Sequence, residues 1–160
     1  MIGSQFNSFL LPFLVSMLPI AELRGGIPLA LSTGIPPIQA YLIGVGGNTV
    51  PVLPLLLGLK YALKIIKKHR QLEKIFNGFK KKSQNKKELI YRYGIGGIVL
   101  LVAIPLPVTG AWTGSLVSFL LSIPIKYAFF AIFAGICIAG LIVLFATLGI
   151  LSIGKLFIGM

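Results

Sequence analysis

The sequence predicts an all-α integral membrane protein built as an inverted repeat of two units. The first observation behind this fold class is composition, because 56% of the 160 residues are apolar and only 11% are charged. Soluble domains carry about 25% charged residues and need a polar shell over most of their surface. The other two observations are a charge confined to one segment and a pattern of broken apolar segments that occurs twice.

The first apolar region, which begins at the N-terminus, is interrupted near its middle. Proline, glycine and the only two charges of this region lie between Leu18 and Pro28. The flanking half-helices, residues 6–18 and 27–33, are too short to cross about 30 Å of hydrocarbon at 1.5 Å per residue. We expect a re-entrant hairpin that enters the membrane from outside. Four ordinary spans remain the alternative architecture.

The first full span is expected at residues 38–59, where Pro51 and Pro54 should kink the helix. A basic segment follows, since residues 60–92 hold twelve of the fifteen basic residues. Short loops rich in lysine and arginine stay in the cytoplasm, so both termini are expected outside, in a prokaryotic plasma membrane. The chain thus divides into repeat one (1–59), the basic loop (60–92) and repeat two (93–160) of a single membrane domain.

The basic loop contains an apolar stripe at helical spacing, formed by Leu72, Ile75, Phe76 and Phe79 between lysines. This pattern predicts an interfacial helix against anionic lipid headgroups. The alternative is that the loop only sets the orientation of the chain. A nucleic-acid partner is not expected, because aromatic residues are sparse and no recognition motif is present.

The second unit repeats this order. A broken region with half-helices at residues 94–103 and 112–121 should form a second re-entrant hairpin, entering from the cytoplasm, and a full span follows at residues 127–154. At a constant offset of 88, residues 18–47 align with 106–135, and seven of the thirty pairs are identical. Opposite orientation of such units is the inverted arrangement of many secondary transporters.

Glu22 and Arg24 are the candidate functional charges, because each costs about 2.5–3.5 kcal/mol at the bilayer centre and is seldom kept there without function. The backbone N–H groups of Gly25 and Gly26 could form an anion-binding concavity beside Arg24, which would clamp a phosphate or carboxylate. Glu22 would carry a proton. The alternative is that the two charges only neutralise each other at the hairpin tip.

The second tip carries no charge and offers hydroxyl groups, backbone and one indole. Asn48 is an amide near the middle of the first full span, where it either lines the cavity or hydrogen-bonds between helices. The predicted substrate- and proton-binding residues are Glu22, Arg24, Gly25, Gly26, Pro28, Asn48, Pro105, Pro107, Thr109, Gly110, Trp112 and Thr113.

The sequence argues against an enzyme. Its one histidine, His69, lies in the basic loop, it has no aspartate, and its one cysteine, Cys137, lies in an apolar run. No catalytic residues, metal site or cofactor are therefore expected.

The stretches Ala21–Ala30 and Pro105–Ser115 resemble the two signature segments of the small multi-drug export family. That family is similar in plan to the DedA and VTT membrane proteins, which have two re-entrant hairpins and are implicated in moving lipids, including polyprenyl phosphate carriers. The resemblance implies a small transporter, expected here to be a proton-linked homodimer that moves an amphipathic or lipid-phosphate-like substrate. The alternatives are efflux of drug-like solutes and a non-transporting assembly subunit.

Overall fold

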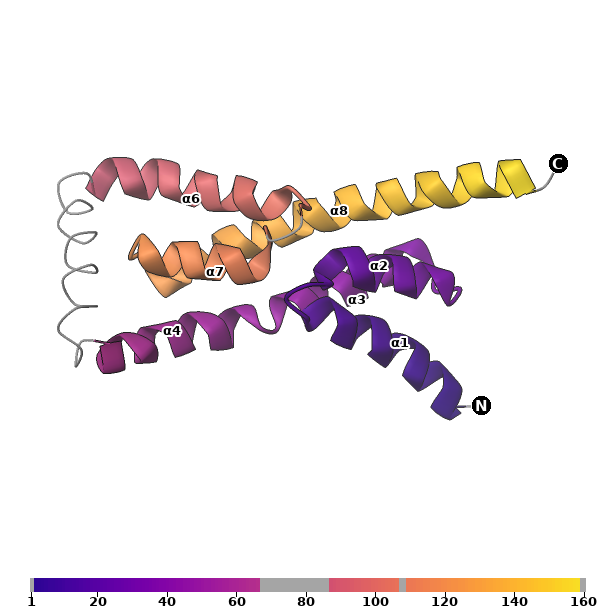
Figure 1. Cartoon of the computed structure of the whole chain (residues 1–160), viewed down its shortest axis with the longest axis horizontal. Helices are drawn as coiled ribbons and strands as arrows, with labels where there is room; N and C mark the ends of the chain where they lie inside the picture. Colours follow the sequence, from indigo (N-terminus) through magenta and orange to yellow (C-terminus); the bar gives the residue numbers. More distant parts are fainter. Residues whose placement is uncertain (1, 67–86, 107–108, 159–160) are drawn as a thin grey trace.

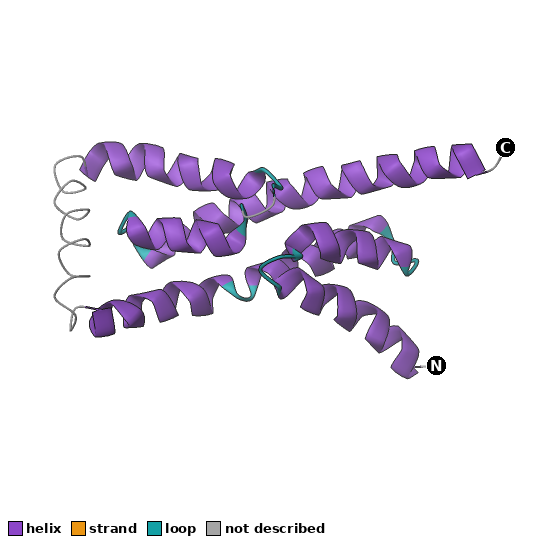
Figure 2. Cartoon of the chain, in the orientation of Figure 1, coloured by secondary structure: helices purple, strands orange, loops and turns teal. Residues whose placement is uncertain are grey.

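The computed structural model describes residues 2–66, 87–106 and 109–158. The predicted all-α class is confirmed, since helices are the only regular structure in these ranges (Figure 2). His69, Pro107 and the predicted interfacial stripe of residues 72–79 lie outside the described residues. The helices are α1 (Ile2–Met17), α2 (Glu22–Ser32), α3 (Pro37–Thr49), α4 (Val52–Ile66), α6 (Lys87–Ala103), α7 (Ala111–Leu120) and α8 (Ile125–Ile158).

Two stretches are long and apolar enough to cross a membrane, at residues 37–59 and 125–152. They match the two predicted full spans. The first consists of α3 followed by α4, and the break between them falls at Val50 and Pro51, because Pro51 has no N–H to continue the helix. Both stretches leave large apolar side chains exposed, among them Leu42 and Phe145, which suits contact with lipid.

Helices α1, α2 and α3 pack against one another in the right half of Figure 1. The chain enters along α1, turns at residues 18–21 and returns along α2. The predicted break was too long, since α2 begins at Glu22 and not at residue 27. Gly25 and Pro28 were taken as helix breakers, but both lie inside α2, and the Gly25 N–H donates to the carbonyl oxygen of Ala21 at 2.9 Å.

Helices α6 and α7 form a second pair in the left half of Figure 1, packed on α8 and, through α7, on α4. The two pairs enter from opposite ends of the molecule, and their tips meet near its middle. Helix α8 runs through both halves and supplies much of the core, including the fully buried Ile132 and Ile136.

Glycines allow the close packing of each pair. A Cβ atom on Gly26 would overlap the Ser16 hydroxyl of α1, and one on Gly47 would overlap the Phe13 carbonyl oxygen. In the other half, a Cβ on Gly135 would lie 2.9 Å from the Val99 carbonyl oxygen and 2.6 Å from the Cβ of Val102. Gly114 also packs on Val102. In each half, therefore, two glycines allow the first helix of the pair to pack closely against the helices that follow it.

The turns after α2 and α7 have the same backbone hydrogen bonds. The Ile35 N–H donates to Ala30 O at 3.2 Å, and the Ile123 N–H donates to Ser118 O at 3.0 Å. Both turns contain one residue with positive φ, Gly34 at 84° and Ser122 at 55°. Each of these pairs is separated by 88 residues, the offset found in the sequence.

Alanine at Gly47 or Gly135 should destabilise the protein by about 1–3 kcal/mol, because the added methyl group would press on the backbone of a neighbouring helix. The measurement is thermal unfolding of the detergent-solubilised protein. Gly97→Ala is the matched control, since a Cβ there meets nothing within 4 Å. Identical melting of the three variants would contradict the close approach of these helices.

Candidate functional site

The tips of the two helix pairs contact each other at the middle of the molecule. One tip is the turn at residues 18–21, and the other is the segment between α6 and α7 (Figure 1). The indole Nε1–H of Trp112 donates to the carbonyl oxygen of Met17 at 3.2 Å. This hydrogen bond satisfies a carbonyl at the end of α1 that no longer has a helical partner.

Glu22 makes the second contact between the tips. It is the first residue of α2 and only 6% exposed, and its carboxylate accepts the backbone N–H groups of Ala111 and Trp112. These are the first two residues of α7, whose N-cap, Gly110, makes no side-chain capping bond. Glu22 therefore caps α7 from another helix and places its negative charge at the positive end of the α7 dipole.

Gly110 provides the space for this carboxylate. A Cβ atom at Gly110 would overlap both Glu22 carboxylate oxygens. The φ of Gly110 is 163°, an extended value that any residue adopts, so the need for glycine is purely steric. Glu22 itself has a φ of +45°, which is unfavourable for a residue with a side chain and costs on the order of 1–3 kcal/mol. Such strained positions cluster at functional sites.

Arg24 is half-buried one half-turn along α2, and its Nη2 donates to the Ile20 carbonyl oxygen at 3.4 Å. Its positive charge also interacts electrostatically with the Glu22 carboxylate. Among the described residues, the hydrogen bonds of both side chains thus go to backbone groups.

The predicted anion-binding concavity at Gly25 and Gly26 is wrong. Both residues lie inside α2, and the Gly25 N–H is taken by Ala21 O. Their lack of a side chain serves packing, since a Cβ on Gly25 would lie 3.0 Å from Val15 of α1. Pro28, also predicted as a site residue, is half-buried inside the same helix.

The hydroxyl of Thr109 shapes its own loop. It donates to Ile104 O at 2.8 Å and Leu106 O at 3.1 Å and accepts the Leu106 N–H at 3.2 Å. The half-buried Pro105 lies within this loop, and Thr113 lies in the first turn of α7. Thr109 thus positions Gly110 and the start of α7, and its hydroxyl is already engaged by the loop.

Asn48 is buried near the end of α3, with 1% of its surface exposed. Its Oδ1 has no hydrogen-bond partner within the described part of the chain, so the interhelical bond considered for it is not seen at this atom. Asn48 follows Gly44 by one helical turn, and Gly44 packs on Ile27 and Leu23 of α2. Asn48 therefore lies on the face of α3 that is turned toward α2.

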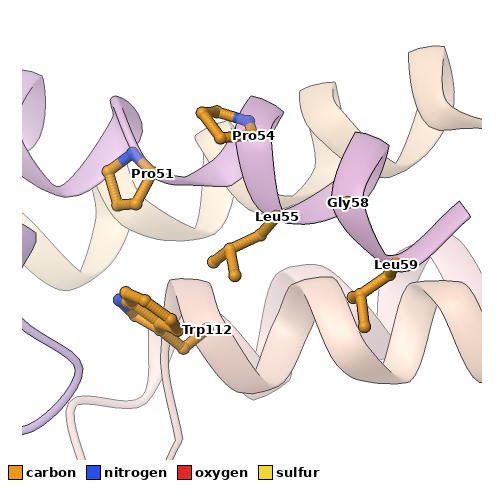
Figure 3. A pocket seen from close by; sticks show the side chains of 6 residues that line it. All are labelled: Pro51, Pro54, Leu55, Gly58, Leu59 and Trp112. Atoms are coloured by element: carbon orange, nitrogen blue, oxygen red, sulfur yellow. The ribbon is translucent and has the colours of Figure 1, made fainter. Parts of the chain in front are cut away.

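A groove between α4 and α7 was not predicted. It has a volume of about 360 Å³ and is lined by Trp112 and by residues 51, 54, 55, 58 and 59 (Figure 3). Their spacing, i, i+3, i+4, i+7 and i+8, places the four later residues on one face of α4, and Pro51, just before α4, continues this face. This spacing was visible in the sequence, but the prolines were interpreted only as the cause of a kink.

These features define a small helical membrane protein with a carboxylate buried at the meeting point of two helix pairs. The family described as "Putative small multi-drug export protein" matches residues 22–142, and the chain belongs to this family. The resemblance seen in the sequence is thereby confirmed. The family name implies a transporter in the membrane rather than an enzyme. No curated protein and no solved structure matches the chain.

Gly110→Ala should separate the tips, because the methyl group would displace the Glu22 carboxylate from α7. We expect a loss of about 1–3 kcal/mol of stability and greater quenching of Trp112 fluorescence by iodide. Gly149→Ala is the control, since a Cβ there meets nothing within 4 Å. Quenching and melting equal to those of the unmodified protein would show that Glu22 does not sit against Gly110.

Proposed function

We propose that the protein exports an amphipathic solute across the membrane in exchange for protons carried by Glu22. The observation behind this proposal is the position of Glu22, whose buried carboxylate lies at the contact between two helix tips. A charge held inside an apolar protein of this kind is functional by default.

The architecture we propose is an inverted repeat with two re-entrant hairpins. The helix pairs α1–α2 and α6–α7 come from opposite ends and stop near the middle (Figure 1). The recurrence of glycine contacts and turn hydrogen bonds at an offset of 88 also favours a repeat. Glu22 and Gly110 are themselves 88 residues apart and in contact. Two residues that are related by a two-fold axis touch each other only next to that axis. Glu22 and Gly110 would therefore lie beside the axis that relates the two repeats.

Protonation of Glu22 provides the coupling in this proposal. An ionised carboxylate makes stronger hydrogen bonds to backbone N–H groups than a neutral one, and it also interacts with the α7 dipole. A proton on Glu22 weakens both interactions and loosens the contact between the tips. Loss of the proton restores the contact. Because the carboxylate belongs to one helix pair and its donors to the other, its protonation changes how the two pairs hold together.

Arg24 is the proposed ligand of an acidic headgroup, such as a lipid phosphate. Its guanidinium has five N–H donors, and within the described part of the chain one hydrogen bond, to Ile20 O at 3.4 Å, engages one of its nitrogens. Planar guanidinium groups suit phosphate and carboxylate oxygens. Efflux of drug-like solutes is the second candidate function, because the family name specifies multi-drug export.

We further propose that residues 60–92 lie in the cytoplasm against anionic lipids and that both termini lie outside. Two copies would form a homodimer, because two spans and two hairpins make a thin wall around a translocation path.

Glu22→Gln and Arg24→Ala test the two proposed roles in proteoliposomes that contain a labelled polyprenyl phosphate. The unmodified protein should move the probe faster when a proton gradient is applied. Glu22→Gln should abolish the response to the gradient. Arg24→Ala should slow movement about tenfold to a hundredfold, as expected for the loss of a charged hydrogen bond.

Lys126→Ala is the matched control for a lost cation, because Lys126 is exposed at the start of α8, and it should leave the rate unchanged. No movement of the probe by well-folded unmodified protein would exclude lipid phosphate. The same vesicles loaded with a neutral or cationic drug-like solute then test the second candidate.

Exchanging the two charges separates a binding site from a structural pair. The double variant Glu22→Arg with Arg24→Glu keeps the net charge but brings a cation to the positive end of α7. We therefore expect loss of transport, measured in the same vesicles. Full transport by the exchanged protein would contradict the headgroup role of Arg24 and would favour a structural pair.

A further inference from the structure

We propose that the groove between α4 and α7 binds the hydrocarbon chain of the transported amphiphile. This inference rests on the proposed function, since it assigns the apolar part of the same substrate. Glu22 and Arg24, the charged residues at the tips, are not among the residues that line the groove.

The shape of the groove suits an extended chain. Its lining runs from Pro51, just before α4, to Leu59 of α4, which corresponds to about 12 Å at the helical rise. On the side of α7 it is lined by Trp112, which faces Pro51 and Leu55 at one end (Figure 3). The volume of about 360 Å³ lies at the lower end of the range for small-molecule pockets. A volume of this size spread along about 12 Å of helix favours a linear chain over a compact ring system.

The chemistry of the lining also favours hydrocarbon. Proline, leucine and glycine present carbon atoms to the groove, and the polar N–H of Trp112 is engaged by Met17 O. Gly58 leaves the groove open between Leu55 and Leu59, because a Cβ there would meet nothing within 4 Å. None of the described residues that line the groove is charged, so this lining suits an uncharged, apolar segment.

The charged part of an amphiphile has its place next to this groove. Trp112 lines the groove with its side chain, while its backbone N–H donates to the Glu22 carboxylate. Arg24 follows Glu22 in the first turn of α2. A chain that lies along α4 with its end at Trp112 thus brings its headgroup to the hairpin tips. Apolar and charged regions of the protein are arranged in the same order as those of an amphiphile.

Trp112 reports on the groove directly, because it is the one tryptophan of the chain. The probe is a single-chain alkyl phosphate with bromine atoms on its chain, which quench tryptophan fluorescence on contact. It is titrated into the full-length protein in micelles of an unbrominated detergent. We expect saturable quenching that the unbrominated alkyl phosphate reverses by competition.

Gly58→Phe places an aromatic ring in the groove and should raise the Kd for the probe about tenfold. Gly96→Phe is the matched control on α6, where a Cβ also meets nothing within 4 Å, and it should bind like the unmodified protein. Quenching that rises without saturation, or that is equal in both variants, would overturn the proposal, since Trp112 would then only be exposed to the micelle.

Transport of the unbrominated alkyl phosphate separates this proposal from the proposed function. In proteoliposomes, Gly58→Phe should slow transport about tenfold, in proportion to its affinity, while Gly96→Phe should not. Saturable binding with full transport by Gly58→Phe would identify a resident membrane lipid and overturn the substrate assignment. Saturable binding without any transport by the unmodified protein would support chain binding and overturn the export function.

Discussion

Backbone groups at the ends of broken helices cannot be left without partners in apolar surroundings, and the centre of this structure is arranged to pair them. Each unsatisfied group in hydrocarbon costs several kcal/mol. The two tips supply partners to each other, because the Met17 carbonyl accepts the Trp112 indole N–H and the first N–H groups of α7 donate to Glu22. In the segment between α6 and α7, the Thr109 hydroxyl donates to the Ile104 carbonyl oxygen. The interruption of the helices thus creates the contact that joins the two halves.

The two tips differ in a complementary way. Glu22 on one side has glycine, Gly110, at the corresponding position 88 residues later, and the carboxylate occupies the space that a second side chain would need. A symmetrical pair of acids could not fit there, and two like charges at this distance would repel each other. Arg24 and Trp112 are likewise 88 residues apart, so a cation in one half corresponds to an aromatic ring in the other. The α1–α2 half contributes the charged side chains of Glu22 and Arg24. The α6–α7 half contributes backbone N–H donors and the apolar surface of the Trp112 ring.

Part of the candidate site could be predicted and part could not. Glu22, Gly110 and Trp112 stood out as an intramembrane acid and as residues of a helix break, and the structure brings them together. The interpretation of Gly25 and Gly26 as anion ligands was wrong, because glycine signals a turn and close helix packing equally well. Only the position of α1 distinguishes these two roles. The groove along α4 was missed because it needs Trp112 from a helix more than fifty residues away in the sequence.

The sequence by itself determined the helical class, the two long apolar spans, the two interruptions and the offset that relates them, because these follow from local hydropathy and from proline and glycine. It also determined which residues are costly to bury. Only the tertiary structure decided what those residues contact: Glu22 caps α7, Arg24 donates to its own turn, and Asn48 is buried, its Oδ1 without a hydrogen-bond partner among the described residues. The physical reason is that capping, packing and groove formation depend on pairs of helices distant in the chain, whose relative placement no local pattern specifies.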